Sequence, residues 1–303
     1  MQKIKIATRK SPLALWQAEF VKSELQKIHS NLEVELVKMS TKGDEILGTS
    51  LSKIGGKGLF IKELEVGMLE GLADIAVHSL KDMPYKLPDE FEIGAVLKRE
   101  NPRDAFVSNN YKSIEDLPIG GVVGTCSHRR IVQIKSLRPD LKILDLRGNV
   151  NTRLQKLDNG EYDAIILAAA GLIRLGFERR ITSEMSFYQS LPAVGQGAVG
   201  IEIRKNDSEI LTLLKPLIDA QTTLEITAER AMNAKIEGSC AAPIAGFAQI
   251  YGETLNIKGL VGDSESNIIL SSSVSGNKNN AQQLGEELAD KLLKMGANKL
   301  LSR

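Results

Sequence analysis

The sequence predicts an α/β protein with mixed, largely parallel sheets, followed by a small α+β domain. Short apolar strands alternate with helices through about residue 200, which is typical of sheets built from strand–helix–strand units. After Leu217 the order changes to one helix, three consecutive strands and a final helix. The chain of 303 residues is longer than one core usually serves, so two or three domains are expected.

The first 39 residues predict two strands with a helix between them. Residues 3–8 are expected to form a strand, and residues 33–39 alternate as a second strand. Between them Ser11 caps a helix whose first turn holds Pro12. Five apolar residues recur at helical spacing and are expected to face the core: Leu13, Trp16, Phe20, Leu25 and Ile28.

A stretch rich in glycine and lysine, residues 41–58, follows the second strand. It holds five glycines and three lysines but few apolar residues. A segment of this length without an element is either a mobile functional loop, such as a lid, or a disordered surface loop, and both interpretations stay open. A helix over 59–71 follows, and a strand over 73–77 leads into His78-Ser-Leu-Lys-Asp-Met-Pro.

The rest of the chain continues the alternation. Strands are expected near 91–97, 104–108, 121–124, 142–146 and 163–168, and helices near 127–137 and 150–159. The last part predicts a helix over 222–236, strands over 245–251, 254–262 and 267–274, and a helix over 280–296. Ligands of parallel sheets bind at the carboxyl ends of strands. The notable polar turns all follow strands: Arg9–Ser11, His78–Asp82, Thr125–Arg130 and Arg147–Arg153.

Composition excludes several classes of protein. The net charge of +1 argues against a general polyanion binder, and an aromatic content of 4% argues against base stacking, so no nucleic-acid partner is expected. Two distant cysteines imply no disulfide framework, and three scattered histidines give no metal-ligand spacing. Neither a signal peptide nor an apolar run of membrane-spanning length is evident. We therefore expect a cytoplasmic protein without a membrane partner or a metal, and nothing demands more than a monomer.

Two arginine-rich turns open predicted helices. Arg129 and Arg130 lie in Gly124-Thr-Cys-Ser-His-Arg-Arg, and Arg147 and Arg153 lie in Leu146-Arg-Gly-Asn-Val-Asn-Thr-Arg. Helix starts favour anions, and the guanidinium group matches carboxylate or phosphate oxygens in pairs. Surface ion pairs are the alternative. The strand–turn–helix setting and two nearby hydroxyls favour a site for a ligand with several negative groups.

Three further residues could carry chemistry. Asp82 follows an apolar strand and could act as a general acid, a general base or a cation stabiliser, with Lys81 beside it, although a turn-capping aspartate is the alternative. Cys240 lies in a loop of small residues that would leave its sulfur accessible, or it is a buried structural cysteine. Gln196, in a glycine-rich crossing between lobes, would be offered to a ligand.

Eight segments in this order resemble the porphobilinogen deaminase (hydroxymethylbilane synthase) family nearly end to end. They are Ala7-Thr-Arg-Lys-Ser-Pro-Leu-Ala-Leu-Trp-Gln, Gly55-Gly-Lys-Gly-Leu-Phe, His78-Ser-Leu-Lys-Asp-Met-Pro, Asn101-Pro-Arg-Asp-Ala-Phe, Gly124-Thr-Cys-Ser-His-Arg-Arg, Leu146-Arg-Gly-Asn-Val, Leu191-Pro-Ala-Val-Gly-Gln-Gly-Ala and Glu229-Arg-Ala-Met. Each segment alone is weak evidence for the family, but all eight segments in this order are very specific to it.

The resemblance implies a transferase of tetrapyrrole biosynthesis. Such enzymes join four porphobilinogen units head to tail with loss of ammonia and release hydroxymethylbilane by hydrolysis. They carry a dipyrromethane cofactor on a cysteine thioether, which by position is Cys240. Asp82 would be the general acid and would stabilise the cation that forms when ammonia leaves, in a water-poor cleft.

The resemblance also distributes the other residues of the site. Cofactor binding would involve Lys81, Asp82, Thr125, Ser127, Arg129, Arg130 and Arg147. Substrate binding would involve Arg9, Ser11, Gln17, Arg147, Arg153, Arg174 and Gln196. Lys57 and Phe60 would belong to the lid.

Three domains are implied by the resemblance. Residues 1–98 with 196–217 and residues 99–195 would form two domains like the lobes of a periplasmic binding protein. Residues 218–303 would form a small α+β domain with a three-stranded sheet.

The arginine turn departs from the family pattern at Cys126 and His128. Cys126 could compete as a reactive thiol, and His128 adds a titratable group.

Two other functions remain possible from the residues themselves. A non-catalytic two-lobed binding protein would explain the arginine turns but would not need Asp82 and an accessible Cys240 together. A thiol enzyme using Cys240 as nucleophile lacks an evident base. Replacing Asp82 with alanine separates these possibilities, since a pure binder keeps its affinity whereas the deaminase loses turnover.

Overall fold

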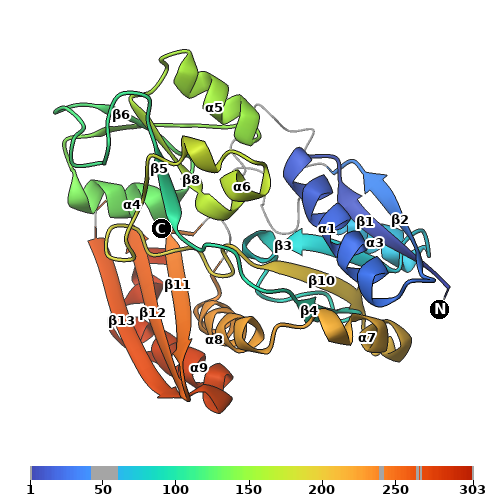
Figure 1. The fold of residues 1–303 in the computed structure, drawn as a ribbon. Coiled ribbons are helices and arrows are strands. Elements are labelled where there is room, and N and C mark those ends of the chain that lie inside the picture. Colours follow the sequence, from blue (N-terminus) through green and yellow to red (C-terminus); the bar gives the residue numbers. More distant parts are fainter. Residues whose placement is uncertain (1, 42–60, 239–241, 264–265, 267, 302–303) are drawn as a thin grey trace. The chain divides into compact units, whose positions relative to one another are not determined.

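The structure is a computed structural model that describes residues 2–41, 61–238, 242–263, 266 and 268–301. The chain divides into two compact units, which are described separately below. Unit 1 comprises Met1–Arg99 and Ala198–Thr223, and unit 2 comprises Glu100–Gly197 and Leu224–Arg303. Unit 1 contains one five-stranded sheet, and unit 2 contains a five-stranded and a three-stranded sheet (Figure 1).

The sheet of unit 1 has the strand order β2-β1-β3-β10-β4. Its strands are β1 (Lys3–Arg9), β2 (Glu33–Met39), β3 (Ile75–Ser79), β4 (Phe91–Val96) and β10 (Val199–Arg204). Strand β1 is parallel to β2 and β3, whereas β10 is antiparallel to both β3 and β4. The sheet is therefore mixed, and its fourth strand comes from far along the chain. That strand was missing from the sequence prediction.

Helices cover both faces of this sheet. Helix α1 (Pro12–Ile28) packs on the face formed by the branched side chains of β1, β3 and β10, together with α7 (Ser208–Leu214). Helix α3 (Lys62–Leu69) packs on the opposite face against Ala7, Ala76 and Phe91. Successive residues of a strand point to opposite faces, so each strand contributes to both layers.

The start of α1 is confirmed, but two of its expected core residues are not. Ser11 is the N-cap, and its Oγ accepts a hydrogen bond from the Ala14 N–H at 3.4 Å. Phe20 and Ile28 are 38% and 44% exposed, so placing them in the core was wrong. The buried face instead consists of Ala14, Gln17, Ala18, Val21 and Leu25. Phe20 lies at its border and stacks on Trp16, one turn away, with ring centroids 5.3 Å apart.

The first sheet of unit 2 has the order β7-β6-β8-β5-β9. Its strands are β5 (Asp104–Val107), β6 (Val122–Gly124), β7 (Lys142–Leu144), β8 (Ala164–Ala168) and β9 (Ser183–Glu184), and its helices are α4 (His128–Leu137), α5 (Val150–Asp158) and α6 (Ala169–Arg174). Strand β6 is parallel to β7 and β8, whereas β5 is antiparallel to β8 and β9. Both large sheets thus contain equal numbers of parallel and antiparallel pairings among their described strands.

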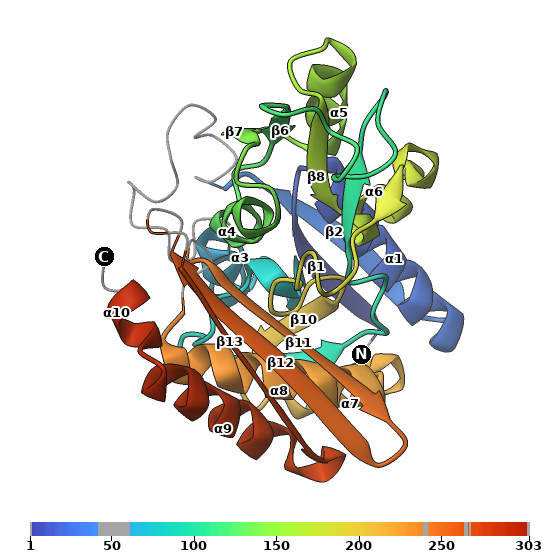
Figure 2. The same cartoon turned by 90° about the vertical axis from the view of Figure 1, so that its left-hand side faces the viewer.

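The second sheet of unit 2 is an antiparallel meander. It consists of β11 (Ile244–Tyr251), β12 (Thr254–Asp263) and β13 (Ile268–Asn277). Helices α8 (Ala220–Ile236) and α9 (Ala281–Lys294) cover one face of it and share its apolar core (Figure 2). The remaining elements of the described residues are α10 (Ala297–Leu301) and the short turns η2 (Leu80–Asp82), η3 (Glu178–Arg180), η4 (Lys215–Leu217) and η5 (Lys278–Asn280). The predicted small α+β architecture is confirmed.

Within the described part of the chain, the helices are too short or too polar to span a membrane.

Candidate active site

In unit 1 the predicted site residues follow two neighbouring parallel strands. Arg9 ends β1, and Ser11 follows it. Lys81 and Asp82 lie in η2, which directly follows β3. Because β1 and β3 are parallel neighbours, their carboxyl ends lie at the same edge of the sheet. The structure therefore brings these four residues to one edge, as expected from the sequence.

Asp82 lies on a firmly anchored turn. Leu80 and Met83 are 2% and 3% exposed, and the Leu80 N–H donates to the Ala198 carbonyl at 3.0 Å. Leu80 also packs on Gly200 of β10, where a Cβ would lie 2.7 Å from its Cδ2. The Asp82 side chain itself is exposed. The fold thus fixes the backbone around this carboxylate, and the water-poor cleft expected around it stays a prediction.

The polar atoms of Ser11 and Gln17 are used within unit 1. The Ser11 hydroxyl caps α1, and Gln17 is 2% exposed and donates from Nε2 to the Ser79 Oγ at 2.8 Å. Gln17 therefore ties α1 to the strand end that precedes Asp82. Substrate contacts of Ser11 and Gln17 stay predictions.

In unit 2 the arginine turns also gather at one sheet edge. Thr125 and Ser127 follow β6, and Arg147 follows β7, which is parallel to β6. Arg174 ends α6, the helix that follows β8. Since β8 is also parallel to β6, the carboxyl ends of all three strands lie together.

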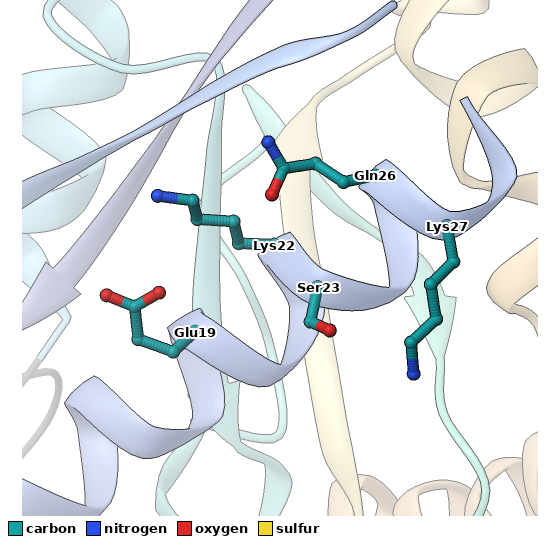
Figure 3. Close-up of a pocket in the computed structure, with 5 residues that line it drawn as sticks. All are labelled: Glu19, Lys22, Ser23, Gln26 and Lys27. Carbon is teal, nitrogen blue, oxygen red and sulfur yellow. The ribbon is translucent and has the colours of Figure 1, made fainter. Parts of the chain in front are cut away.

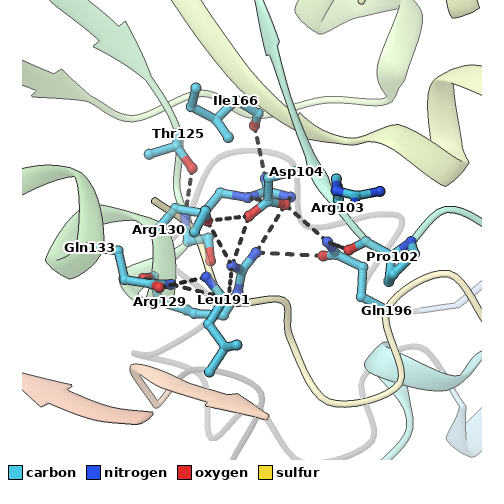
Figure 4. A network of polar contacts seen from close by, with 12 residues as sticks. Pro102, Arg103, Asp104, Thr125, Arg129, Arg130, Gln133, Ile166, Leu191 and Gln196 are labelled. Carbon is cyan, nitrogen blue, oxygen red and sulfur yellow. Dashed lines mark hydrogen bonds and ion pairs between the residues drawn. The ribbon is translucent and has the colours of Figure 1, made fainter. Parts of the chain in front are cut away.

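A buried carboxylate, Asp104, holds both arginines of the first turn (Figure 4). Its Oδ1 accepts from Arg130 Nη2 at 2.7 Å and Nε at 3.0 Å, and its Oδ2 lies 2.8 Å from Arg129 Nη1. Arg129 Nη1 also donates to the Leu191 carbonyl at 2.7 Å, and Arg130 Nη1 donates to the Ile166 carbonyl at 2.8 Å. These contacts fix both guanidinium groups at the start of α4.

The charges of this network do not balance. Two guanidinium groups face one carboxylate, so the group carries one more positive than negative charge. Burial alone would raise the pKa of Asp104, but the charges of Arg129 and Arg130 outweigh burial and hold its pKa well below its usual range. The surplus charge lies at a helix start without an acidic residue in its first turn, and such a place suits an anion.

Asp104 was given no role from the sequence. It lies in Asn101-Pro-Arg-Asp-Ala-Phe and begins β5, directly opposite Ala168 at the end of β8. Its position at the start of an apolar strand was the available signal of a buried ion pair, because a buried carboxylate needs a cationic partner. The two buried arginines are ion-paired, but not on the surface as the alternative interpretation had it.

The other arginines of the predicted site have different partners. Arg147 Nε donates to Asp145 Oδ2 at 2.5 Å, and this hydrogen bond raises the pKa of Arg147. Arg153 Nε donates to the Gly148 carbonyl at 2.8 Å. Arg174 Nη2 donates to the Gly197 carbonyl at 2.7 Å, and burial lowers the pKa of Arg174. Arg147 and Arg153 are partly exposed, whereas the pair on Asp104 is buried.

Gln196 is part of the buried network. It is 1% exposed, and its Nε2 donates to the Pro102 carbonyl at 2.6 Å and to Asp104 Oδ1 at 3.0 Å. The preceding Gly195 N–H donates to Glu229 Oε2 at 2.8 Å, and the other oxygen of Glu229 accepts from the Ala248 N–H at 2.9 Å. Glu229 on α8 thereby joins the Gln196 loop to β11. The structure places Gln196 in the buried network of unit 2, and its contact with a ligand stays a prediction.

Several predicted residues lie outside the described residues. They are Cys240, Lys57, Phe60 and all of the 41–58 stretch except the buried Thr41. Cys126 is a partly buried free cysteine, and His128 is exposed.

A shallow pocket on α1 is unrelated to these residues. Glu19, Lys22, Ser23, Gln26 and Lys27 line it (Figure 3). All five are on one helix, and charges of both signs alternate along it. We assign it no role.

Solved structures with a related arrangement include the VFT2 domain of BvgS from Bordetella pertussis. That domain is 15% identical to this chain, with a TM-score of 0.45, and the match covers 76% of this chain and 92% of the domain.

Family models and relatives match almost the whole chain. The model described as porphobilinogen deaminase, dipyromethane cofactor binding domain, matches residues 4–212, and the model of the porphobilinogen deaminase C-terminal domain matches residues 223–294. Porphobilinogen deaminase from Ruthia magnifica subsp. Calyptogena magnifica is 64% identical over 298 residues, which are 98% of each chain. Porphobilinogen deaminase from Vesicomyosocius okutanii subsp. Calyptogena okutanii is 62% identical over the same share. The chain therefore belongs to the porphobilinogen deaminase family.

Proposed function

We propose that this chain is a porphobilinogen deaminase of tetrapyrrole biosynthesis that joins four porphobilinogen molecules and releases hydroxymethylbilane by hydrolysis. Sequence identity above 60% to two porphobilinogen deaminases over nearly the full length supports the activity. The structural observation that carries the proposal is the buried network of Asp104, Arg129 and Arg130 with its surplus positive charge. Each porphobilinogen brings two carboxylates, and a fixed local cation attracts them without making the whole chain basic.

The residues of the arginine turn fit the dipyrromethane cofactor. Its acetate and propionate groups are anions, and the turn offers two hydroxyls and two guanidinium groups at a helix start. We infer that the cofactor is held by Lys81, Asp82, Thr125, Ser127, Arg129, Arg130 and Arg147, and attached through a thioether to Cys240. When bound, the cofactor supplies a covalent primer for the joined units.

Asp82 is proposed as the catalytic residue. Its carboxyl group protonates the leaving amine, and the carboxylate that this leaves stabilises the positive charge that develops on the substrate. Anchoring of Leu80 and Met83 holds this charge in place, so it needs little reorganisation during the reaction.

The proposed substrate residues fall into two groups. Arg9, Ser11, Arg147 and Arg153 are at least partly exposed and are assigned direct contacts. Gln17, Arg174 and Gln196 are more deeply buried or bonded to the protein, and we propose that they act by holding neighbouring groups in place. Lys57 and Phe60 are assigned to a lid over the substrate.

We further propose a cytoplasmic monomer with three domains. The domains would be residues 1–98 with 196–217, residues 99–195 and residues 218–303, which agrees with one sheet for each domain. Light scattering of the purified protein tests the monomer, and limited proteolysis tests the domain boundaries.

The intact mass of the purified protein tests the cofactor and its attachment. We expect an excess equal to two condensed porphobilinogen units on the peptide that holds Cys240. Cys240→Ser should abolish the excess, and Cys126→Ser is the matched control that should retain it. An adduct that survives in Cys240→Ser and disappears in Cys126→Ser would move the attachment to Cys126.

Turnover of Asp82→Asn tests the catalytic role. Loss of a positioned acid typically lowers the rate about 100-fold to 10,000-fold. Asp89→Asn, on an exposed aspartate seven residues further along the chain, is the control and should leave the rate unchanged. Full turnover by Asp82→Asn would refute the assignment.

A further inference from the structure

Three ionisable residues lie between α3 and the sheet of unit 1. His78 is on β3, Glu202 is on β10 and Glu65 is on α3. His78 is 6% exposed and Glu202 is 0% exposed, while Glu65 is half-buried. The same layer holds a cluster of buried apolar side chains that includes Leu64, Met68, Ala76 and Phe91. The proposed reaction uses none of the three, and charged groups are costly in such surroundings.

The first contact of the group joins two adjacent strands. His78 Nε2 lies 2.9 Å from Glu202 Oε2. With the Glu202 oxygen as acceptor, the His78 ring donates this hydrogen bond from Nε2. The two residues are diagonal neighbours on the α3 face, because His78 pairs with Gly200 and Ala76 pairs with Glu202.

The second contact requires a proton on a carboxyl group. Glu202 Oε1 is buried, and no ordinary donor of the described residues reaches it. Glu65 is the carboxyl group on α3 that interacts with Glu202, and one of two interacting carboxyl groups can donate to the other only if it is protonated. Burial and the charge of Glu202 raise the pKa of Glu65 to about 7, so Glu65 carries this proton.

The group lies directly before the proposed catalytic turn. Asp82 is four residues after His78, and Leu80 of the same turn rests on Gly200 of β10. A contact that holds the end of β3 against β10 therefore also holds the turn that follows.

We propose that His78, Glu202 and Glu65 are positioning residues, in which Glu202 accepts from a protonated neighbour on each side, and that this group fixes the end of β3 against β10 and α3 and so orients Asp82. This inference rests on the role proposed above for Asp82. It adds a function to residues that would otherwise be an unexplained buried polar group.

The surrounding charges determine the effect of pH. Glu65 faces Glu202 from β10, Glu90 from the segment before β4 and Lys62 from its own helix, and His78 faces Glu202 from β3. Arg204, on the same face of β10, is bound to the Met68 and Ala73 carbonyls and to Asp74 and Asp207. Loss of the proton from Glu65 places a second negative charge beside Glu202. We therefore expect the contact to weaken as the pH rises through about 7.

Glu65→Gln and Glu65→Ala test the inference, with Glu70→Gln on the exposed end of α3 as control. A glutamine amide donates to Glu202 at every pH, whereas alanine donates at none. Thermal unfolding and the rate constant kcat should be measured between pH 4.5 and 8.5. The wild type and Glu70→Gln should lose several degrees in Tm as the pH rises from about 4.5 to 7, because the unfolded chain then releases a proton that folded Glu65 keeps, and they should lose part of kcat as the pH rises through about 7. Glu65→Gln should lose neither, with KM unchanged, and Glu65→Ala should show a several-fold lower kcat already at pH 6.

Two results would overturn the inference. Parallel Tm curves for wild type and Glu65→Gln would show that folded Glu65 keeps no proton. A flattened Tm curve with an unchanged pH dependence of kcat would show that the group supports the fold but does not position Asp82. Failure of the catalytic assignment itself is seen separately, as full turnover by Asp82→Asn.

Discussion

Arg130 Nη2 lies 2.7 Å from Asp104 Oδ1 where almost no solvent reaches either side chain. Asp104 comes from the start of β5 and Arg130 from the first turn of α4, so this pair fixes a helix start to a neighbouring strand end. A buried guanidinium held on both sides by fixed acceptors keeps its orientation when a ligand arrives, which reduces the entropy lost on binding.

Replacing Asp104 with asparagine should destabilise the protein strongly. The change keeps the shape of the side chain but leaves two buried guanidinium charges without their carboxylate. Breaking such a pair costs about 3–5 kcal/mol. Urea unfolding gives the measurement, and Asp145→Asn is the control, since its exposed pair with Arg147 should contribute less than about 1 kcal/mol. Equal costs for the two variants would contradict the importance of burial.

The pH dependence of that cost follows from the lowered pKa of Asp104. In the unfolded chain the pKa of an aspartate such as Asp104 is about 3.9. Its contribution is fully present above this value and is lost as the pH falls toward the folded pKa. The difference in unfolding free energy between wild type and Asp104→Asn should therefore be constant from pH 8 to 5 and shrink below about pH 4. A difference that already shrinks between pH 7 and 5 would be inconsistent with this pairing.

Gly197→Ala should destabilise unit 2 more than Gly252→Ala. Both glycines have positive φ, 88° and 61°, which costs other residues about 1–2 kcal/mol. At Gly197 an added Cβ would also collide with the Glu100 carbonyl, whereas at Gly252 it would meet open space. Thermal unfolding of both variants provides the comparison. Similar losses of stability would mean that the backbone at Gly197 moves aside without cost.

Glu229→Gln should lower stability by about 1–3 kcal/mol, the typical cost of leaving a buried donor unsatisfied. The Gly195 and Ala248 N–H groups each bond one oxygen of Glu229, and an amide retains only one acceptor. Glu287→Gln, which alters an exposed ion pair with Lys291, is the control. Chemical denaturation of both variants would settle the matter, and an unaffected Glu229→Gln would argue against this link between the Gln196 loop and β11.

Gln17 and Ser79 should behave as one unit. The hydrogen bond between them is the contact by which Gln17 holds the strand end before Asp82. A double-mutant cycle with Gln17→Ala and Ser79→Ala should therefore show a coupling of at least about 0.5 kcal/mol in stability. If Gln17 also binds substrate, Gln17→Ala alone should raise KM beyond the effect of Ser79→Ala. Strict additivity in both measurements would separate the two residues.

Much of the fold follows from local patterns. The strands of both large sheets carry apolar runs bounded by turn residues, and α1 carries its cap at Ser11. Strand β10 was missed because the glycine-rich segment before it suggested a crossing, although Val199, Ile201 and Ile203 alternate as in a strand. The buried face of α1 differs from the predicted one. The small residues Ala14 and Ala18 make the contact with the sheet that the larger Phe20 was expected to make.

The site was predictable in outline only. Parallel strands bring their carboxyl ends together, so the position of the arginine turns followed from the chain order. The turns at Arg130 and Arg147 look alike in sequence, yet one is buried on Asp104 and the other remains partly exposed on Asp145. This difference depends on a partner 26 residues away on another strand, which periodicity does not reveal.

The position of β10 between β3 and β4 also sets an order of assembly during synthesis. A ribosome produces all five strands of the first sheet of unit 2, through Glu184, before it reaches Val199. That sheet can close while β3 and β4 still lack the strand that joins them. Until β10 is synthesised, the first hundred residues therefore form an incomplete sheet with unpaired strand edges. Nascent chains aggregate through such edges, and chaperones bind them.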